Sequence, residues 1–214
     1  MRVAPEGRPF IVASTAVLAG LVGLGALGAS RWWIAALAWA PIAAWTPAFF
    51  RDPHRSGPHD ARVLLAPADG KVVSVSPADE PEFLRGPATR VSVFMNVFNV
   101  HINYAPADGR VAYRRYRPGA FVNATLDKAS EQNEQMSLGI QTDRGPVLVR
   151  QIAGLIARRI VTDPVAGAAV RQGQRFGLIR FGSRVDTFLP PNARPVVSVG
   201  MRTVGGVSVI GEWA

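Results

Sequence analysis

The chain has 214 residues, 48% of them hydrophobic, and carries 24 basic side chains against 15 acidic ones. This length and apolar content exclude a disordered chain, and they predict one domain with an additional segment or a single large β-domain. The absence of cysteine excludes a disulfide framework, thiolate metal sites and a cysteine nucleophile. Lys71 and Lys128 are the only lysines, so chemistry that needs a lysine amine has two candidates.

Two uncharged apolar runs, residues 10–29 and 32–50, lie near the N-terminus. About 20 apolar residues are needed to cross a bilayer, so each run is just long enough. The second run contains four of the five tryptophans, and this residue is enriched where membrane helices meet the interface. Arginines precede the first run and follow the second. The positive-inside rule therefore predicts a helical hairpin with both ends in the cytoplasm.

Two alternatives to a spanning hairpin remain open. The first run has the basic flank of a secretory signal peptide, although its apolar stretch exceeds a usual signal core. A hairpin that only dips into one leaflet is the closer alternative, because Pro41 and Pro47 interrupt the second run. All three interpretations place the protein at a membrane. The remainder of the chain is basic, and a basic domain beside an anionic leaflet requires no nucleic acid as a partner.

From Arg62 onward, short runs rich in β-branched residues alternate with turn signals. Such runs, without long amphipathic helices between them, predict an antiparallel sandwich or barrel. The expected fold is mainly β: an antiparallel barrel-sandwich domain at 56–214, after an N-terminal hydrophobic helical hairpin and linker at 1–55. We expect strands at 62–65, 71–76, 90–95, 147–152, 176–181, 184–189, 196–199 and 207–210, and a helix only around 127–135.

A seven-residue segment occurs twice, 39 residues apart. Ala66-Pro67-Ala68-Asp69-Gly70-Lys71-Val72 returns as Ala105-Pro106-Ala107-Asp108-Gly109-Arg110-Val111. Two similar units, each a turn followed by a strand, suggest a pseudo-symmetric barrel-sandwich. The alternative is that Pro-x-Asp-Gly is a favourable turn used twice.

Three histidines are candidates for acid–base chemistry. His54 and His59 lie in a polar, proline-rich linker, whereas His101 lies in an apolar stretch at 91–104. If that stretch is extended, Asn99, His101 and Asn103 share one face, which could line a pocket. A hydrogen-bonded structural histidine is the alternative. No metal-ligand spacing, strand-to-helix glycine loop or Gly-x-Ser-x-Gly element is present.

One short motif suggests a function without catalysis. Asp127-Lys128-Ala129 resembles the tip of a lipoyl-bearing hairpin, so a membrane-anchored, lipoyl-like carrier or adaptor module is an alternative function. The residues that follow, 130–135, are polar and helix-prone, whereas such a hairpin needs a returning strand.

Five segments together resemble one enzyme family. The most specific is Phe181-Gly182-Ser183-Arg184-Val185-Asp186, and the others are Phe49-Phe50-Arg51-Asp52-Pro53, Pro67-Ala68-Asp69-Gly70, residues 94–106 around His101, and residues 123–134. Almost from end to end, the chain resembles the short bacterial and archaeal phosphatidylserine decarboxylases.

The resemblance implies a self-processing enzyme whose cofactor is a pyruvoyl group made from its own Ser183. The Ser183 hydroxyl attacks the Gly182 carbonyl, the peptide bond becomes an ester, and elimination and hydrolysis leave the pyruvoyl group. Cleavage between residues 182 and 183 gives a large chain, 1–182, and a small chain, 183–214, that remain together as a heterodimer. The pyruvoyl ketone then forms a Schiff base with phosphatidylserine and accepts the electrons released with carbon dioxide, which yields phosphatidylethanolamine.

The resemblance also implies roles for three further side chains. His101 occupies the position of the family's base and Asp69 that of its orienting acid, while the share of His101 in self-cleavage and in decarboxylation stays open. Arg184 is expected to hold the phosphate or carboxylate of the substrate, with a salt bridge to Asp186 as the alternative. The expected partner is phosphatidylserine in an anionic membrane, at the cytoplasmic face of the cell membrane, without metal or nucleic acid. A higher oligomer stays open.

Overall fold

The computed structural model describes residues 2–28, 30–120, 132–154, 159–180 and 183–214. The chain divides into two compact units, Met1–His54 and Arg55–Ala214. Each predicted catalytic residue belongs to the second unit.

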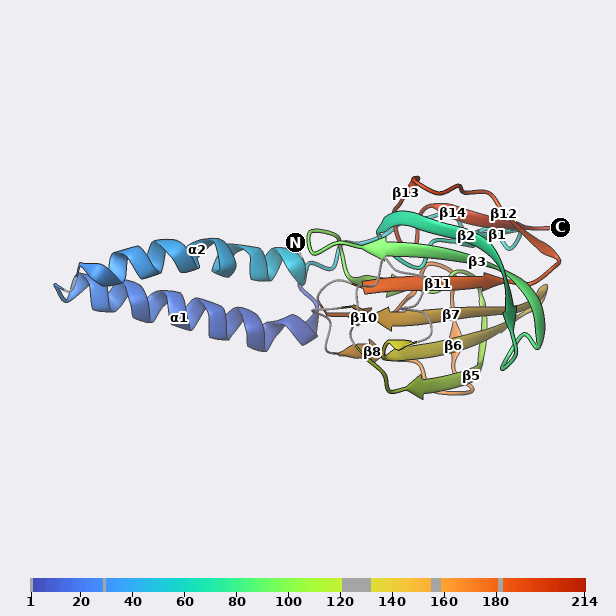
Figure 1. Cartoon of the computed structure of the whole chain (residues 1–214), viewed down its shortest axis with the longest axis horizontal. Coiled ribbons are helices and arrows are strands. Elements are labelled where there is room, and N and C mark those ends of the chain that lie inside the picture. Colours follow the sequence, from blue (N-terminus) through green and yellow to red (C-terminus); the bar gives the residue numbers. More distant parts are fainter. Residues whose placement is uncertain (1, 29, 121–131, 155–158, 181–182) are drawn as a thin grey trace. The chain divides into compact units, whose positions relative to one another are not determined.

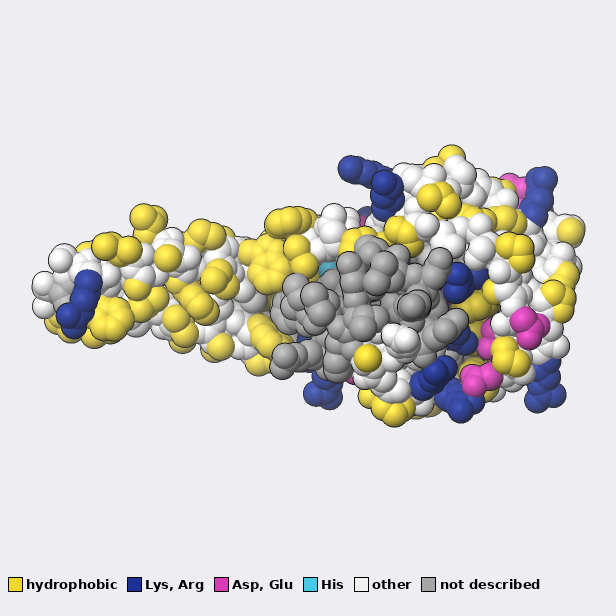
Figure 2. Space-filling view, in the orientation of Figure 1, with side chains coloured by type: hydrophobic (Ala, Val, Ile, Leu, Met, Phe, Trp, Pro, Cys, Tyr) yellow, Lys and Arg dark blue, Asp and Glu magenta, His cyan; other side chains and the backbone are white. Residues whose placement is uncertain are grey.

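The first unit is a helical hairpin. A short 3-10 helix, η1 (Pro5–Gly7), leads into α1 (Arg8–Ala26), and α2 (Arg31–Phe49) returns beside it in the opposite direction (Figure 1). On the face shown in Figure 2, hydrophobic side chains lie along both helices. Of the helices in the described residues, the segment Pro5–Ala26 is long and apolar enough to cross a membrane. The two predicted helices are confirmed, and α1 indicates membrane association. That both helices span the membrane, with their ends in the cytoplasm, stays a prediction.

The second unit is built from antiparallel strands, as predicted. The largest sheet has the order β13-β2-β3-β11-β7-β6-β5-β9, and its central strands follow one another in Figure 1. Two smaller sheets have the orders β1-β14-β12 and β4-β10-β8. The strands are β1 (Val63–Leu65), β2 (Gly70–Glu80), β3 (Gly86–Met95), β4 (Ile102–Tyr104), β5 (Gly109–Arg117), β6 (Gln135–Thr142), β7 (Gly145–Ala153), β8 (Ile160–Thr162), β9 (Ala169–Val170), β10 (Arg175–Ile179), β11 (Ser183–Leu189), β12 (Ala193–Pro195), β13 (Arg202–Thr203) and β14 (Val209–Trp213).

The hydrophobic core joins the large sheet to the smaller ones. Val93, Val149 and Val185 come from three neighbouring strands of the large sheet, and they belong to one buried cluster with Ile179 of β10 and Ile210 of β14. Burial of this face explains the β-branched runs in the sequence, because such side chains pack well on a pleated surface.

One predicted strand is corrected, and one predicted helix lies mostly outside the described residues. Residues 196–199 are not a strand: the Ser198 carbonyl accepts a hydrogen bond from Met201, and the turn closes at Gly200 with a φ of +99°. Strand β12 lies just before this run, because Ala193–Pro195 is the segment that pairs with β14. Within the helix predicted at 127–135, residues 127–131 lie outside the described residues, residue 132 is helical, and Gln135 already begins β6.

The repeated segment makes reciprocal contacts. The Leu65 N–H donates to the Pro106 carbonyl and the Tyr104 N–H donates to the Pro67 carbonyl, each at 2.9 Å. Pro67 and Pro106 hold equivalent places in the two copies, and Leu65 and Tyr104 each immediately precede a copy, so the contact supports a pseudo-symmetric arrangement rather than one turn used twice by chance.

Each aspartate of the repeat accepts a hydrogen bond from the main chain of a different loop. Asp69 Oδ1 accepts from the Gly205 N–H at 2.8 Å, and Asp108 Oδ1 accepts from the Gln172 N–H at 2.7 Å. The glycine after each aspartate is needed for space. A Cβ at Gly70 would lie 2.2 Å from the Phe94 carbonyl oxygen.

Candidate active site

Ser183 begins strand β11, in the centre of the large sheet. Met95 of β3 lies opposite it on one side and Ala153 of β7 on the other. The residue is fully buried, with an exposed fraction of 0%. Gly182, the predicted partner in the cleaved bond, lies outside the described residues.

The structure brings His101 to Ser183 from 82 residues away. Its Nδ1 lies 3.2 Å from Ser183 Oγ. His101 immediately precedes β4, where its carbonyl accepts a hydrogen bond from Ile179 of β10, and its side chain is buried. The apolar neighbours of His101 in the sequence therefore serve to place an imidazole inside the domain, next to a hydroxyl.

The hydrogen-bond partners of His101 determine its tautomer. Nε2 lies 2.9 Å from the Asn96 carbonyl oxygen, which can only accept. The ring proton of a neutral His101 is therefore assigned to Nε2, and the lone pair on Nδ1 faces the Ser183 hydroxyl. This arrangement allows the imidazole to take the hydroxyl proton, as a general base does.

A turn between two asparagines holds that carbonyl in place. The Asn99 N–H donates to the Asn96 carbonyl at 3.0 Å, and Asn99 Oδ1 accepts from the Asn96 N–H at 2.9 Å. Asn96 Oδ1 accepts in turn from the Phe98 N–H at 2.9 Å. Sequence analysis missed Asn96. Two asparagines three residues apart were an available signal, because their side chains favour turns of this kind.

Asp69 has other partners in this conformation. It accepts two hydrogen bonds from Arg55 Nη2, at 2.8 and 3.0 Å, and one from the Gly205 N–H. His101 is not among its described partners, and a main-chain carbonyl occupies the position at Nε2 that an orienting acid would take. The role of Asp69 in orienting His101 stays a prediction.

Arg184 forms the salt bridge that the sequence left as an alternative. Its Nε and Nη2 donate to the two carboxylate oxygens of Asp186 at 2.6 and 2.9 Å, and both side chains are almost completely buried. Neighbouring residues of a strand point to opposite faces, so the Arg184 guanidinium is directed away from the face that carries Ser183 Oγ. Its contact with substrate stays a prediction.

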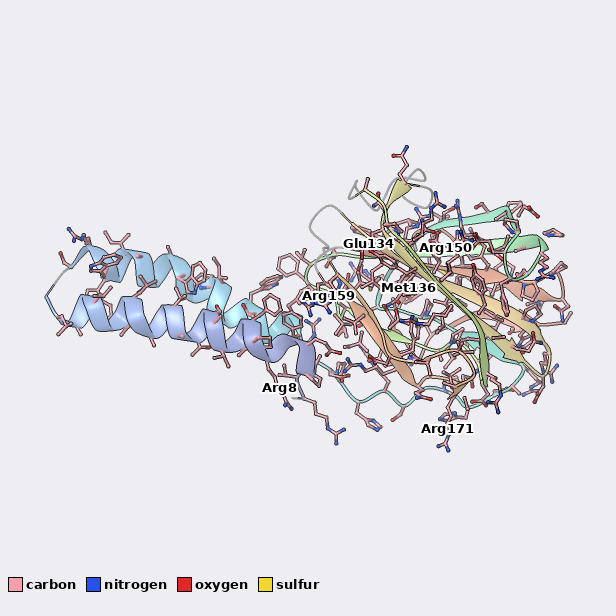
Figure 3. The ribbon with its side chains drawn as sticks, turned by 90° about the horizontal axis from the view of Figure 1, so that it is seen from below. Arg8, Glu134, Met136, Arg150, Arg159 and Arg171 are labelled. Atoms are coloured by element: carbon pink, nitrogen blue, oxygen red, sulfur yellow. The ribbon has the colours of Figure 1, made fainter. Side chains whose placement is uncertain are left out.

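A separate charged cavity of about 380 Å³ contains none of these residues. Glu80, Glu82, Arg115, Arg117 and Arg150 are among its lining residues. Arg150, labelled in Figure 3, lies 4.8 Å over the ring of Phe188. Burial lowers the pKa of Arg150 from its ordinary value, while Asp186 and Glu80 oppose that change. The described residues contain no group of three His, Asp or Glu side chains suited to a metal ion.

Comparison with known proteins identifies the family. A family model described as phosphatidylserine decarboxylase matches residues 42–211. A relative from Azorhizobium caulinodans, named phosphatidylserine decarboxylase proenzyme, is 46% identical over 211 residues, which is 97% of this chain and 88% of the relative. One from Xanthobacter autotrophicus with the same name is 47% identical over 212 residues, or 96% and 86%.

The chain belongs to the phosphatidylserine decarboxylase family. The resemblance predicted from five sequence segments is therefore confirmed. The matched residues, 42–211, contain Asp69, His101 and Ser183. Membership of an enzyme family disfavours the carrier or adaptor alternative, whose Lys128 lies outside the described residues.

Proposed function

We propose that this protein decarboxylates phosphatidylserine to phosphatidylethanolamine, with a pyruvoyl group that it makes from Ser183. The observation that carries the proposal is the buried Ser183 hydroxyl, 3.2 Å from an imidazole nitrogen whose lone pair faces it. Family membership supplies the reaction, and this contact supplies the chemistry that can start self-processing.

Self-cleavage begins with the proton of Ser183. As His101 Nδ1 takes that proton, Ser183 Oγ attacks the Gly182 carbonyl carbon, so that a C–O ester bond forms and the C–N peptide bond breaks. Elimination releases chain 1–182 as a carboxylate and leaves dehydroalanine at position 183. This group tautomerises and is hydrolysed by water, which supplies the ketone oxygen, while the nitrogen departs as ammonia.

The surroundings of Ser183 suit both stages. The pyruvoyl group, once present, supplies a ketone for the amino group of the substrate and a sink for the electrons released with carbon dioxide. Burial between β3 and β7 keeps bulk solvent from the reacting atoms, and the hydrolysis that completes self-processing needs only one water molecule. The same ladders hold the two products together, because the small chain retains β11 and its pairing with both neighbours.

The proposal places the enzyme at the cytoplasmic face of the cell membrane, anchored by the N-terminal hairpin. Its substrate is phosphatidylserine in an anionic bilayer, and its large and small chains form a heterodimer. We keep Asp69 as a residue that supports His101, and Arg184 as a candidate for the substrate phosphate.

Intact mass and covalent trapping test the proposal together. The purified protein is expected to consist of chains 1–182 and 183–214, whereas Ser183→Ala should remain one inactive chain. Ser198→Ala is the matched control, because Ser198 is an exposed serine of the same small chain. Borohydride added during turnover should attach substrate to the small chain, which contains no lysine. Decarboxylation by an uncleaved chain, or label on Lys71 or Lys128, would contradict the pyruvoyl mechanism.

A further inference from the structure

A completely buried amide near Ser183 has unused hydrogen-bond donors. Asn103 lies in β4, two residues after His101, with an exposed fraction of 0%. Its Oδ1 accepts from Gln151 Nε2 at 2.8 Å. The only described acceptor for its Nδ2 is the Met95 thioether, at 3.8 Å. Sulfur is a weak acceptor, and leaving a buried donor this poorly satisfied costs stability, which marks the amide for a functional explanation.

Neighbouring groups determine which way this amide points. Gln151 Nε2 also lies 3.3 Å from the Val161 carbonyl oxygen, and Thr162 Oγ1 donates to Gln151 Oε1. A carbonyl only accepts, so the end of Gln151 that faces Val161 and Asn103 must be its NH2 group. Asn103 must then present its oxygen to Gln151, and its NH2 group is directed towards Met95.

That direction is also towards the reacting residue. Met95 lies opposite Ser183 across the β3–β11 ladder. Gln151 lies two residues before Ala153, which is opposite Ser183 on the other side. Because residues two apart on a strand share a face, Asn103 extends the surface that His101 begins. The donors of Asn103 therefore face the same interior region as His101 Nδ1 and Ser183 Oγ.

We propose that Asn103 binds the carboxylate of the serine headgroup and so determines specificity for it. This inference rests on the proposed function. In extended backbone, equivalent atoms of residues two apart are separated by about 6.6 Å, so the Asn103 backbone lies about that much farther along the chain than that of His101, whose side chain contacts Ser183. Standard bond lengths put a carboxylate oxygen about 3.5 Å from a ketone carbon to which an amino acid is attached. A hydrogen bond adds about 2.9 Å, so this reach is of the same order as the spacing between the two residues.

A neutral donor suits the reaction better than a cation would. The carboxylate loses its charge as carbon dioxide leaves, so a guanidinium bound to it would stabilise the starting state more than the transition state. A neutral amide also orients the carboxylate, but it stabilises the starting state less than a guanidinium does. Met95 has a flexible side chain that can move aside for the ligand.

Two water-soluble headgroups test this assignment. The processed protein is mixed with glycerophosphoserine or glycerophosphoethanolamine, and borohydride-trapped label on chain 183–214 is measured by mass across a range of concentrations. The measurement counts adducts that still carry the substrate carboxylate together with adducts that have already lost carbon dioxide. Asn103→Leu removes the donors at similar volume. We expect it to weaken labelling by the serine headgroup about 10- to 100-fold, the size of an effect on a charged acceptor, and labelling by the ethanolamine headgroup less than twofold.

The ratio of labelling by the serine headgroup to labelling by the ethanolamine headgroup distinguishes a loss of specificity from general damage to the fold. Gln172→Leu is the matched control, because Gln172 is another buried amide, bonded to the Val63 carbonyl at 2.8 Å. It should lower the melting temperature without changing the ratio. Asn103→Asp, which puts an oxygen in place of Nδ2, should change the ratio in the same direction as Asn103→Leu and decides the question if the leucine variant does not fold.

Several outcomes would overturn the assignment. These are an unchanged ratio in a folded Asn103 variant, loss of self-cleavage in such a variant, and failure of both variants to fold, which would make the amide a structural group. If the unsubstituted protein is not cleaved, or is labelled by neither headgroup, the proposed function fails instead.

Discussion

Replacement of His101 by alanine is expected to block self-processing. Ser183 Oγ has His101 Nδ1 as its only described hydrogen-bond partner, so the described residues offer no second base in place. General-base catalysis contributes about 10²- to 10⁴-fold to a rate, equivalent to about 2.7–5.5 kcal/mol of activation free energy. We therefore expect His101→Ala to slow cleavage by about this factor. Asn99→Ala, which loosens the turn that holds the Asn96 carbonyl, should slow it by about tenfold.

The measurement is the rate at which newly synthesised full-length chain is converted into its two products, followed by gel electrophoresis and intact mass. His59→Ala is the control, because His59 is an exposed histidine of the linker. It should process at the unsubstituted rate. A thermal melt of each variant establishes that slow processing does not reflect an unfolded domain.

Complete processing of a folded His101→Ala chain within about threefold of the normal rate would remove His101 from the mechanism. A normal rate for Asn99→Ala, with His101→Ala slow, would refute only the part of the argument that concerns orientation of the ring.

Three further predictions address the fold and the other candidate residues. Asp69→Asn is expected to slow self-cleavage in the same gel assay, whereas Asp108→Asn, at the equivalent place in the repeat, should leave it nearly unchanged; equal rates would limit Asp69 to its structural contacts. Asp186→Asn leaves the buried Arg184 guanidinium without its carboxylate and should cost about 3–5 kcal/mol in urea unfolding of an uncleaved chain; a loss below about 1 kcal/mol would contradict this. A chain that begins at Arg51 should no longer sediment with membranes in high salt yet still cleave itself, because the second unit contains both reacting side chains; a folded but uncleaved product would reveal a role for the helices.

Local sequence patterns predicted much of the fold of this protein. The uncharged runs predicted the helical hairpin, because length and apolarity determine whether a helix suits a bilayer. Alternation along 99–103 predicted one face for Asn99, His101 and Asn103, because strand geometry has a period of two residues. The structure forms a turn at 96–99 and begins β4 only at Ile102, so Asn99 does not continue that strand. The repeated Asp-Gly turns suggested a pseudo-symmetric arrangement, and the structure shows that each aspartate accepts a hydrogen bond from the main chain of a separate loop.

Contacts between distant residues decided the rest. Whether residues 196–199 form a strand depended on where the chain pairs with β14, and β-propensity does not specify a partner. The group that bonds His101 Nε2 is a main-chain carbonyl. Every residue has such a carbonyl, so the sequence does not show which one contacts the ring. The Val161 carbonyl fixes the orientation of the Gln151 amide, and Gln151 in turn fixes the orientation of the Asn103 amide. Hydrogen bonding is directional, so the same side chains acquire a chemical role only when folding places each donor against an acceptor.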